Sequence, residues 1–544
     1  MKKIKKIFAV LLSLAMVLGM SMTTFAADDI IGNADDEGQL IVNGITKEEG
    51  ISVNAYKIVQ ANYENDSFTG YTVVDGYNFA DYTNPSAEEI AKAADYAKAT
   101  AGLTSYPLTF DEETGSYKSE TNLPVGAYVI IVEGSDTYSY NPAVASIGYI
   151  NKDGENQYDT GKETVDMSTD NSVWVKKSGL PAVDKKATTD GEGNTDKGTS
   201  ANIGDNVIYT VEVKPIPSYT GKYPVLNVVD TLSSGLTYNG NDKLSVTIEG
   251  ETLVAGTDYV VEEPVANPDG TTTITVDFAK DNVYKLNDYA GKTAVITYSA
   301  TLNENAKLNE ISNGNDVILN YTKDSKTNGN DTTDESKTYT YTFDIDGEVS
   351  GTTGIITKVG EGENSEFLNG AIFKLYAQTE ADKETKPSYE ALKTRTPYMN
   401  KNFPTGSVES ADGGQLHITG LAAGTYYLVE TKAPNNYSVN THVFEVKISA
   451  TYYEAEDEGI TNALQVGMLK TWSVEIDGTQ TASFSVNNEG TSTAAIGGTD
   501  IPNTKISSLP STGGIGTTIF TIGGCLIMIA AAGLFFASRR KSAK

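Results

Sequence analysis

Short runs of alternating apolar and polar residues, separated by Gly, Asn, Asp and Thr, dominate this 544-residue chain. Alternation with a period of two is typical of β-strands that bury one face, and the separating residues favour turns. The only amphipathic helical pattern that we identify is Ser86–Thr100, where Ser86 and Glu89 match a capping box. The sequence therefore predicts an all-β protein with one short helical insert.

The charged and metal-binding residues exclude several classes of function. Because 72 acidic residues against 41 basic ones give a formal net charge of −31, the surface repels phosphate backbones, and we expect no nucleic-acid partner. The only histidines are His417 and His442, and the only cysteine is Cys525. This composition excludes cysteine–histidine zinc sites, cysteine–histidine nucleophiles and intrachain disulfides, and we expect neither a metal nor a cofactor.

The N-terminus, Met1–Ala26, has the three parts of a secretory signal peptide. Four lysines lie within the first six residues, Ile7–Gly19 is apolar, and residues 24–26 form a small-residue cleavage site. The apolar run is short for a membrane-spanning helix, so we expect export and cleavage instead of anchoring.

The C-terminus carries a second apolar run, Ile515–Ala537, which contains no charge and is followed by a basic cluster that begins at Arg539. This order indicates a membrane stop with a cytoplasmic tail. The residues just before it read Leu-Pro-Ser-Thr-Gly, with Leu509, Pro510, Thr512 and Gly513 at the characteristic positions.

Together these C-terminal features resemble the cell-wall sorting signal of Gram-positive surface proteins. The resemblance implies that a sortase cysteine attacks the Thr512 carbonyl, that Gly513 leaves with the tail, and that an amine resolves the acyl-enzyme. The chain would be the substrate in this chemistry, and its final location would be the cell wall. A plain single-span membrane protein is the alternative interpretation.

Shifts in composition divide the chain into five parts: a signal peptide (1–26), three domains (27–177, 178–346 and 347–505) and the sorting signal (506–544). A Leu-x-x-Gly-x-Tyr pattern that ends in Glu occurs in both Asn122–Glu133 and Gly420–Glu430, and this weak repeat supports the division. We expect three tandem immunoglobulin-like β-sandwiches in a linear rod.

Three polar residues of the third domain share a face with apolar neighbours. Strand alternation puts Lys358 in phase with Ile356, Glu430 with Leu428, and Asn503 with Ile501. If these faces form the core, a lysine, a glutamate and an asparagine are buried together. Exposed strand residues would fit the same alternation equally well.

Burial of such a group has a chemical consequence. It lowers the pKa of the lysine and raises that of the glutamate, so a neutral Lys358 amine could attack the side-chain carbonyl of Asn503. A protonated Glu430 could polarise that carbonyl and transfer a proton while ammonia leaves. The product is a Lys–Asn isopeptide bond that forms once per molecule, which is self-modification and not enzymatic turnover.

Ile355–Val359, Phe367–Tyr376, Gly424–Pro434 and Asn503–Lys505 together resemble a Cna B-type domain. In that family the first-strand Lys, a Glu and the last-strand Asn form an isopeptide bond. The resemblance therefore implies that Lys358 and Asn503 are cross-linked and that Glu430 promotes the reaction.

The second domain resembles the central isopeptide domain of sortase-assembled backbone pilins, in Pro181–Lys186, Ile203–Thr210, Val229–Tyr238 and Asn313–Tyr321. This resemblance implies a Lys–Asp–Asn set consisting of Lys185, Asp230 and Asn315, with Asp230 as the acid. Asn313 lies in the same phase as Asn315, and Lys186 is the second choice for the amine. In the first domain Asn43 occupies the place of a bond-forming lysine, so we predict no cross-link there despite Glu133.

Backbone pilins also provide the lysine to which sortase joins the next subunit. The usual Tyr-Pro-Lys-Asn motif is incomplete in Val173–Pro181, where Lys176 and Lys177 are both available. We expect Lys177 to be the acceptor, because it lies at the junction of strand and linker.

The sequence thus predicts the shaft subunit of a covalent surface pilus that serves adhesion. The expected partners are pilin-specific and housekeeping sortases, identical subunits, ancillary pilins and peptidoglycan, with an unidentified surface receptor. The alternative is a monomeric wall-anchored adhesin, or a tip or basal pilin of the same domain type. A wall-anchored glycosidase is disfavoured because no paired-carboxylate motif stands out.

Overall fold

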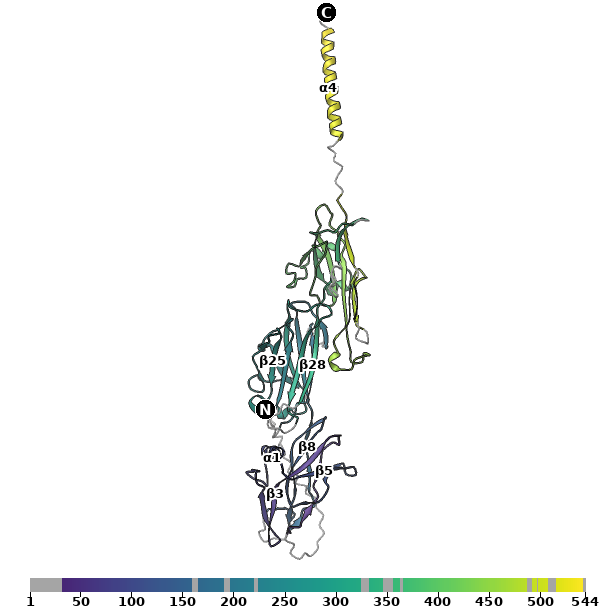
Figure 1. The fold of residues 1–544 in the computed structure, drawn as a ribbon. Coiled ribbons are helices and arrows are strands. Elements are labelled where there is room, and N and C mark those ends of the chain that lie inside the picture. Colours follow the sequence, from purple (N-terminus) through teal and green to yellow (C-terminus); the bar gives the residue numbers. More distant parts are fainter. Residues whose placement is uncertain are drawn as a thin grey trace. The chain divides into compact units, whose positions relative to one another are not determined.

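The computed structural model describes residues 32–158, 165–189, 196–219, 224–323, 332–345, 356–362, 365–486, 492–496, 498–506 and 515–541. Strands predominate over helices in the ribbon, which confirms the predicted all-β class (Figure 1). The chain divides into two compact units, one reaching to Thr342 and including Thr451–Lys470, the other beginning at Phe343. We keep the names first, central and third domain for residues 27–177, 178–346 and 347–505. The predicted signal peptide lies outside the described residues.

The first domain is built on an eight-stranded sheet with the order β10-β8-β3-β5-β6-β2-β14 and with β4 paired to β3. Its strands are β2 (Ile41–Asn43), β3 (Ser52–Glu64), β4 (Ser67–Val73), β5 (Ser105–Asp111), β6 (Ser116–Ser119), β8 (Gly126–Glu133), β10 (Ala143–Ile147) and β14 (Ser172–Trp174). Smaller pairings join β1 (Glu37–Gly38) to β7 (Leu123–Pro124), β9 (Tyr138–Tyr140) to β15 (Lys177–Gly179), and β11 (Tyr149–Asn151) to both β12 (Asn156–Gln157) and β13 (Val165–Met167).

Strand β8 is buried on both faces, which explains its nearly continuous apolar sequence. Tyr128 and Ile130 pack into the core of the sheet. Val129 and Ile131 point the other way and pack in a cluster with alanines of helix α1 (Ala87–Ala99). This helix confirms the prediction for Ser86–Thr100, including the capping box at its start.

The central domain consists of two sheets that face each other across one core. The first sheet contains β16 (Ala182–Thr188), β18 (Asn206–Lys214), β20 (Leu236–Tyr238), β21 (Ser245–Ile248), β22 (Glu251–Thr252) and β26 (Ala294–Leu302). The second contains β17 (Gly198–Ser200), β19 (Leu226–Leu232), β23 (Val260–Val261), β24 (Val265–Ala266), β25 (Thr272–Asp277), β27 (Asn313–Tyr321) and β28 (Thr332–Tyr341). Short 3₁₀ turns are η1 (Asn241–Lys243), η2 (Lys280–Asn282) and η3 (Leu286–Tyr289).

The third domain pairs its first and last strands, β29 (Ile356–Gly360) and β37 (Thr499–Asn503), in parallel. Its larger sheet has the order β31-β30-β32-β33-β34-β35-β36. These strands are β30 (Ile372–Ala377), β31 (Ser407–Glu409), β32 (Gly424–Lys432), β33 (Phe444–Tyr452), β34 (Leu469–Ile476), β35 (Thr479–Val486) and β36 (Ser492–Ile496). One 3₁₀ turn, η4 (Ala463–Gln465), follows β33.

The prediction that helix is confined to Ser86–Thr100 is wrong for the third domain. Helices α2 (Glu380–Glu384) and α3 (Tyr389–Lys393) contain five residues each, which is too short to produce a helical period in the sequence. Leu392 of α3 packs in a cluster with Tyr427 and Val429, so β32 is also buried on both faces.

The repeat seen in the sequence has the same local structure in both places. The Tyr128 hydroxyl donates to the carbonyl of Pro124 at 2.5 Å, and the Tyr426 hydroxyl donates to that of Ala422 at 3.0 Å. In both cases the tyrosine fastens the start of a buried strand to the chain four residues earlier.

Helix α4 (Ile515–Lys541) contains the predicted apolar run. Its segment Ile519–Arg539 is long and apolar enough to cross a membrane, with a mean hydropathy of 2.3 in its most apolar window. The predicted span 515–537 therefore corresponds to a single helix.

Candidate cross-linking sites

In the third domain, strands from both sheets bring Lys358, Glu430 and Asn503 together. Lys358 and Asn503 lie on the neighbouring strands β29 and β37, and Glu430 comes from β32. Their exposed fractions are 0%, 0% and 1%, so all three lie in the core. The alternative that these residues are exposed strand positions is wrong.

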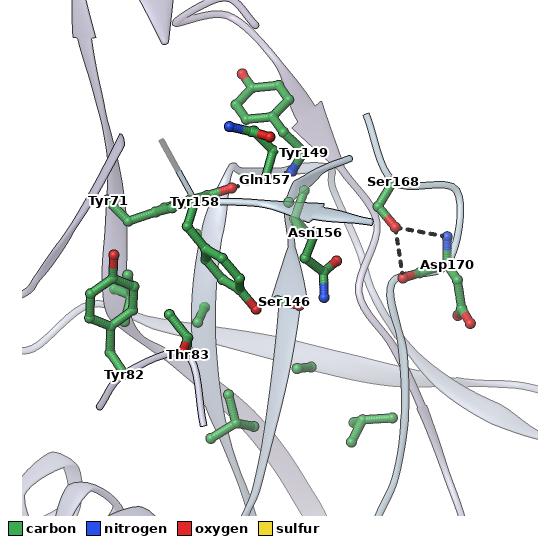
Figure 2. Close-up of a pocket in the computed structure, with 18 of the residues that line it drawn as sticks. Tyr71, Tyr82, Thr83, Ser146, Tyr149, Asn156, Gln157, Tyr158, Ser168 and Asp170 are labelled. Carbon is green, nitrogen blue, oxygen red and sulfur yellow. Dashed lines mark hydrogen bonds between the residues drawn. The ribbon is translucent and has the colours of Figure 1, made fainter. Parts of the chain in front are cut away.

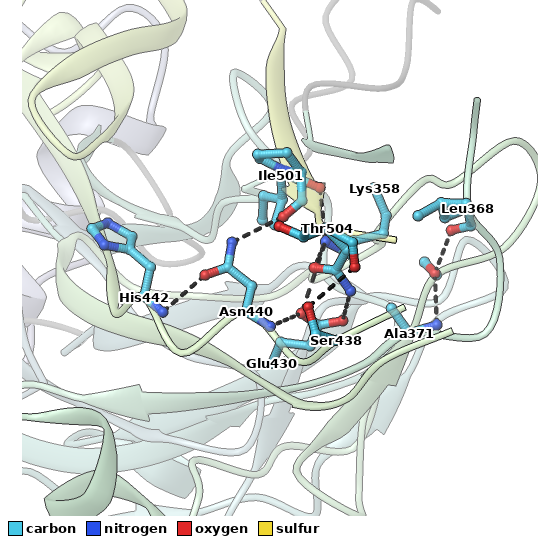
Figure 3. A network of polar contacts seen from close by, with 12 residues as sticks. Lys358, Leu368, Ala371, Glu430, Ser438, Asn440, His442, Ile501 and Thr504 are labelled. Carbon is cyan, nitrogen blue, oxygen red and sulfur yellow. Dashed lines mark hydrogen bonds and ion pairs between the residues drawn. The ribbon is translucent and has the colours of Figure 1, made fainter. Parts of the chain in front are cut away.

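The contacts place the amine at the amide group and the carboxyl group at the amide nitrogen. Lys358 Nζ donates to Asn503 Oδ1 and, at 2.8 Å, to the carbonyl of Ile501. Asn503 Nδ2 donates to Glu430 Oε1 at 2.7 Å, and Lys358 Nζ lies 3.8 Å from Glu430 Oε2. The backbone N–H of Asn440 donates to that same Oε2 at 2.8 Å (Figure 3).

Burial changes the protonation of this group in the direction that amide formation needs. Desolvation lowers the pKa of Lys358 to about 8, although the nearby Glu430 charge opposes the shift. Desolvation also raises the pKa of Glu430, against the hydrogen bonds from Asn440 and Asn503 and the charge of Lys358. A neutral amine and a protonated carboxylic acid thus become accessible together.

The central domain contains a second set, and here the residues come from facing sheets. Lys185 lies on β16 of one sheet, whereas Asp230 on β19 and Asn315 on β27 belong to the other. Their exposed fractions are 0%, 3% and 0%. A bond between Lys185 and Asn315 would therefore join the two sheets of the sandwich.

A tyrosine that the sequence analysis did not select connects these three residues. Lys185 Nζ lies 2.6 and 2.5 Å from the two Asp230 oxygens and 2.8 Å from the Tyr298 hydroxyl. Asn315 Nδ2 donates to the Tyr298 oxygen at 2.8 Å, and the Tyr298 hydroxyl donates to Asp230 Oδ2 at 2.6 Å. Burial lowers the pKa of Lys185 to about 8 and raises that of Asp230, in each case against the charge of the other.

The alternative residues of the central domain are placed differently. Lys186 is exposed and points away from the core. Asn313 is buried, but its amide is engaged with the backbone: it accepts from Lys307 N at 2.8 Å and donates to the carbonyls of Lys307 and Thr340 at 3.0 and 3.2 Å. These contacts favour Lys185 and Asn315 over their neighbours.

The first domain places the corresponding positions apart from any buried amine. Asn43 accepts a hydrogen bond from the Ser116 hydroxyl at 2.6 Å. The Glu133 side chain is 42% exposed and forms an ion pair with Lys98 at 2.9 Å. Among the described residues of this domain, the buried polar side chains other than tyrosine are all serines.

The two candidate acceptor lysines are exposed. Lys177 begins β15, where it pairs with Tyr140 of β9. Its amine donates to the Thr46 hydroxyl and lies 4.2 Å from the centre of the Tyr138 ring. Lys176 uses its backbone carbonyl to accept from Asn141 N at 2.9 Å. The sorting-motif residues Leu509, Pro510, Thr512 and Gly513 lie outside the described residues.

The first domain also has a surface cavity of about 150 Å³, lined by residues of β8, β10 and β12. Tyr71, Tyr82 and Tyr158 form part of its wall (Figure 2). Among the described residues that line the cavity, Asp170 is the only carboxylate, and none is a histidine, cysteine or lysine. These lining residues do not include the paired groups that acid–base or nucleophilic catalysis requires. Within the described part of the chain, no cluster of His, Cys, Asp and Glu could hold a metal.

Family models match four segments of the chain. They describe a T6 antigen Ig-like domain over residues 35–177 and a Gram-positive pilin backbone subunit 2, Cna-B-like domain over residues 203–325. A prealbumin-like fold domain matches residues 352–459, and the LPXTG cell wall anchor motif matches residues 501–544. The trypsin-resistant surface T6 protein of Streptococcus pyogenes serotype M6 is 27% identical, across 98% of this chain and 99% of the relative. The chain therefore has the domain composition of a Gram-positive backbone pilin.

One of the similar solved structures supports the fold of this chain. The T6 backbone pilin of serotype M6 Streptococcus pyogenes, a modular three-domain protein, is 21% identical, covers 87% of this chain and 99% of its own, and has a TM-score of 0.51. The major pilin SpaA of Corynebacterium diphtheriae is 15% identical over 86% of this chain and 100% of its own, with a TM-score of 0.44. The anchor motif identifies this pilin as a cell-wall-anchored surface protein. Its family is structural and not enzymatic.

The stability of an unlinked third domain should depend on pH in a direction that the Lys358 pKa determines. Asn503→Ala leaves Lys358 as a free amine whose folded-state pKa, about 8, lies below the ordinary 10.5. Between these values the unfolded chain binds more protons than the folded one, so stability rises with pH. From pH 8 to 9.5 we expect a gain on the order of 1–2 kcal/mol. Glu430 contributes the opposite slope at lower pH, because its folded-state pKa is raised.

Urea unfolding followed by Trp472 fluorescence measures this slope, because Trp472 is 1% exposed in the third domain. Trp174→Phe removes the other tryptophan, which is 66% exposed, without disturbing a core. The matched control is the same background with Asn503 intact. A urea midpoint in Asn503→Ala that stays constant from pH 8 to 9.5 would contradict the assignment of a desolvated amine.

Proposed function

We propose that this backbone pilin is the shaft subunit of a pilus polymerised by sortase, and that two intramolecular Lys–Asn bonds stabilise it. The observation that carries the proposal is the burial of a lysine, an acid and an asparagine in each of two domains, joined by direct hydrogen bonds in the third domain and through the Tyr298 hydroxyl in the central one. Fully buried lysines are rare because desolvation of the charge is costly even beside an acid. Two such groups in one chain point to a reaction that removes the charge.

The reaction in the third domain balances as follows. Neutral Lys358 Nζ attacks Cγ of Asn503, so that a C–N bond forms, and the bond from Cγ to Nδ2 breaks. Glu430 gives a proton to Nδ2, with which it already shares a hydrogen bond of 2.7 Å, and recovers one from Nζ. Ammonia leaves and an amide remains, with no oxidant, metal or cofactor required.

Each cross-link would constrain the unfolded chain more than the folded one. The third-domain bond spans 145 residues and would join the first strand of the domain to the last, across the parallel pair β29–β37. By analogy with a disulfide that closes a loop of this length, the stabilisation is about 5 kcal/mol. These cross-links would take the place of disulfides, which a chain with one cysteine cannot form within itself.

Polymerisation would join Thr512 of one subunit to Lys177 of the next, with Lys176 as the alternative acceptor. The amine of Lys177 is exposed, yet Thr46 and the Tyr138 ring hold it at a defined place. A lysine presented in this way suits attack on an acyl-enzyme, because fewer conformations are lost when it docks. Because the donor Thr512 and the acceptor Lys177 are different residues of the subunit, the contact would be head-to-tail and would extend into a fibre. The pilus would serve adhesion.

The two internal bonds predict a mass deficit. When Ala27–Ser508 is produced without a sortase, its intact mass should be two ammonia masses below the sequence mass. Lys358→Ala and Lys185→Ala should each reduce the deficit to one ammonia, because each removes one nucleophile. Lys186→Ala is the matched control and should retain the full deficit, since Lys186 is exposed beside Lys185. A wild-type mass equal to that of the sequence would contradict both cross-links.

The acceptor assignment predicts different behaviour for the two adjacent lysines. Lys177→Arg retains the charge but removes the nucleophile, because a guanidinium stays protonated. With the pilus sortase present, this variant should lose the ladder of covalent multimers on a denaturing gel, while Lys176→Arg keeps it. The reverse result would make Lys176 the acceptor. A single band for the wild-type chain would favour the monomeric adhesin.

A further inference from the structure

The two candidate sites differ in how the acid reaches the nitrogen that must leave. In the third domain, Glu430 Oε1 accepts directly from Asn503 Nδ2 at 2.7 Å. In the central domain, Asn315 Nδ2 donates to the Tyr298 hydroxyl at 2.8 Å, and that hydroxyl donates to Asp230 Oδ2 at 2.6 Å. An aspartate is one methylene shorter than a glutamate. In the central domain the Tyr298 hydroxyl lies between this shorter acid and the amide nitrogen.

Neighbouring strands of one sheet hold Tyr298 in place. It lies on β26, next to β18, and its ring stacks on Tyr209 with centroids 5.2 Å apart. Only 3% of its surface is exposed, so bulk water does not supply a competing proton path. Burial and the Asp230 charge raise the pKa of the Tyr298 hydroxyl well above its ordinary value. The hydroxyl therefore remains protonated and able to donate.

We propose that Tyr298 is a catalytic residue of the central cross-link, relaying a proton from Asp230 to the departing nitrogen of Asn315. The inference rests on the proposed function, because it assumes that Lys185 and Asn315 react. Tyr298 contacts both reacting nitrogens, Lys185 Nζ and Asn315 Nδ2, at 2.8 Å each. A Phe at this position would keep the ring and remove only the hydroxyl, which is the group with the chemical role.

The protons balance along this path. Lys185 Nζ first transfers a proton to the Asp230 carboxylate and then attacks Cγ of Asn315. The Tyr298 hydroxyl gives its proton to Nδ2 and takes the proton of Asp230, and the bond from Cγ to Nδ2 breaks. Asp230 then accepts the second proton from Nζ. The products are the amide, ammonia and a neutral Asp230. Burial favours this uncharged form, because it raises the pKa of the Asp230 carboxyl group.

The test follows both cross-links in one full-length chain, produced in cells without a sortase. After a pulse of labelled synthesis, digestion and mass spectrometry measure the cross-linked fraction of the peptides containing Lys185 and Lys358. In Tyr298→Phe we expect the central bond to form at least tenfold more slowly, the range for losing a general acid. The third-domain bond is an internal control and should form at the wild-type rate.

Two further variants separate proton relay from packing. Tyr238→Phe is the matched control, because this ring contacts Tyr298 edge-on at 5.9 Å while its hydroxyl donates to Asn241. It should leave the central rate unchanged. Asp230→Glu in the Tyr298→Phe background provides the longer acid, and we expect it to recover part of the lost rate.

An unchanged central rate in Tyr298→Phe would overturn the inference. Equal slowing in Tyr238→Phe, together with no rescue by Asp230→Glu, would also overturn it, because lost packing would then explain both variants. If the wild-type chain itself contains no Lys185–Asn315 peptide, the proposed function fails for this domain, a result distinct from the other two.

Discussion

Two lysine amines with no exposed surface set the physical problem that this structure must solve. A charged ammonium inside a β-sandwich is destabilising unless it is paired, and even a paired charge is often no better than an apolar side chain. Lys185 and Lys358 each lie beside a carboxyl group. Lys358 also donates to the Asn503 amide, and Lys185 shares the Tyr298 hydroxyl with Asn315. Conversion to an amide would remove the charge altogether. Because each site needs strands from both sheets, the sandwich must assemble before the bond can form.

The two sites solve the same problem with different geometry. In the third domain the amine and the amide lie on neighbouring parallel strands, and the acid approaches from the other sheet. In the central domain the amine faces both the acid and the amide across the core. A bond in the first arrangement would close the domain at its two ends, whereas a bond in the second would fasten one sheet to the other. The second would resist separation of the two sheets, whereas the first would resist separation of the strands at the two ends of its domain.

Alternation along single strands predicted the β class and placed Lys358, Glu430 and Asn503 inward, because each strand keeps one face in the core. The central set came from the resemblance to backbone pilins, and its residues are also buried. Alternation could not separate Asn313 from Asn315, since both share a phase and only the backbone groups near Lys307 distinguish them. It also missed Tyr298, although that residue lies in phase with buried neighbours. An inward tyrosine is an ordinary core residue until the pairing of distant strands shows what its hydroxyl contacts.

Burial also separates two reactions that use the same functional group. The chain would carry two lysines that form internal bonds and one that sortase uses. The first two must not react with sortase, and the third must not form an internal bond. Lys185 and Lys358 are enclosed, so no enzyme can reach them. Lys358 already donates to Asn503, and Lys185 and Asn315 both contact the Tyr298 hydroxyl. Lys177 lies on the surface, where an enzyme has access and its neighbours are a hydroxyl and an aromatic ring in place of an acid–amide pair. Burial thus determines which of the two reactions each amine can undergo.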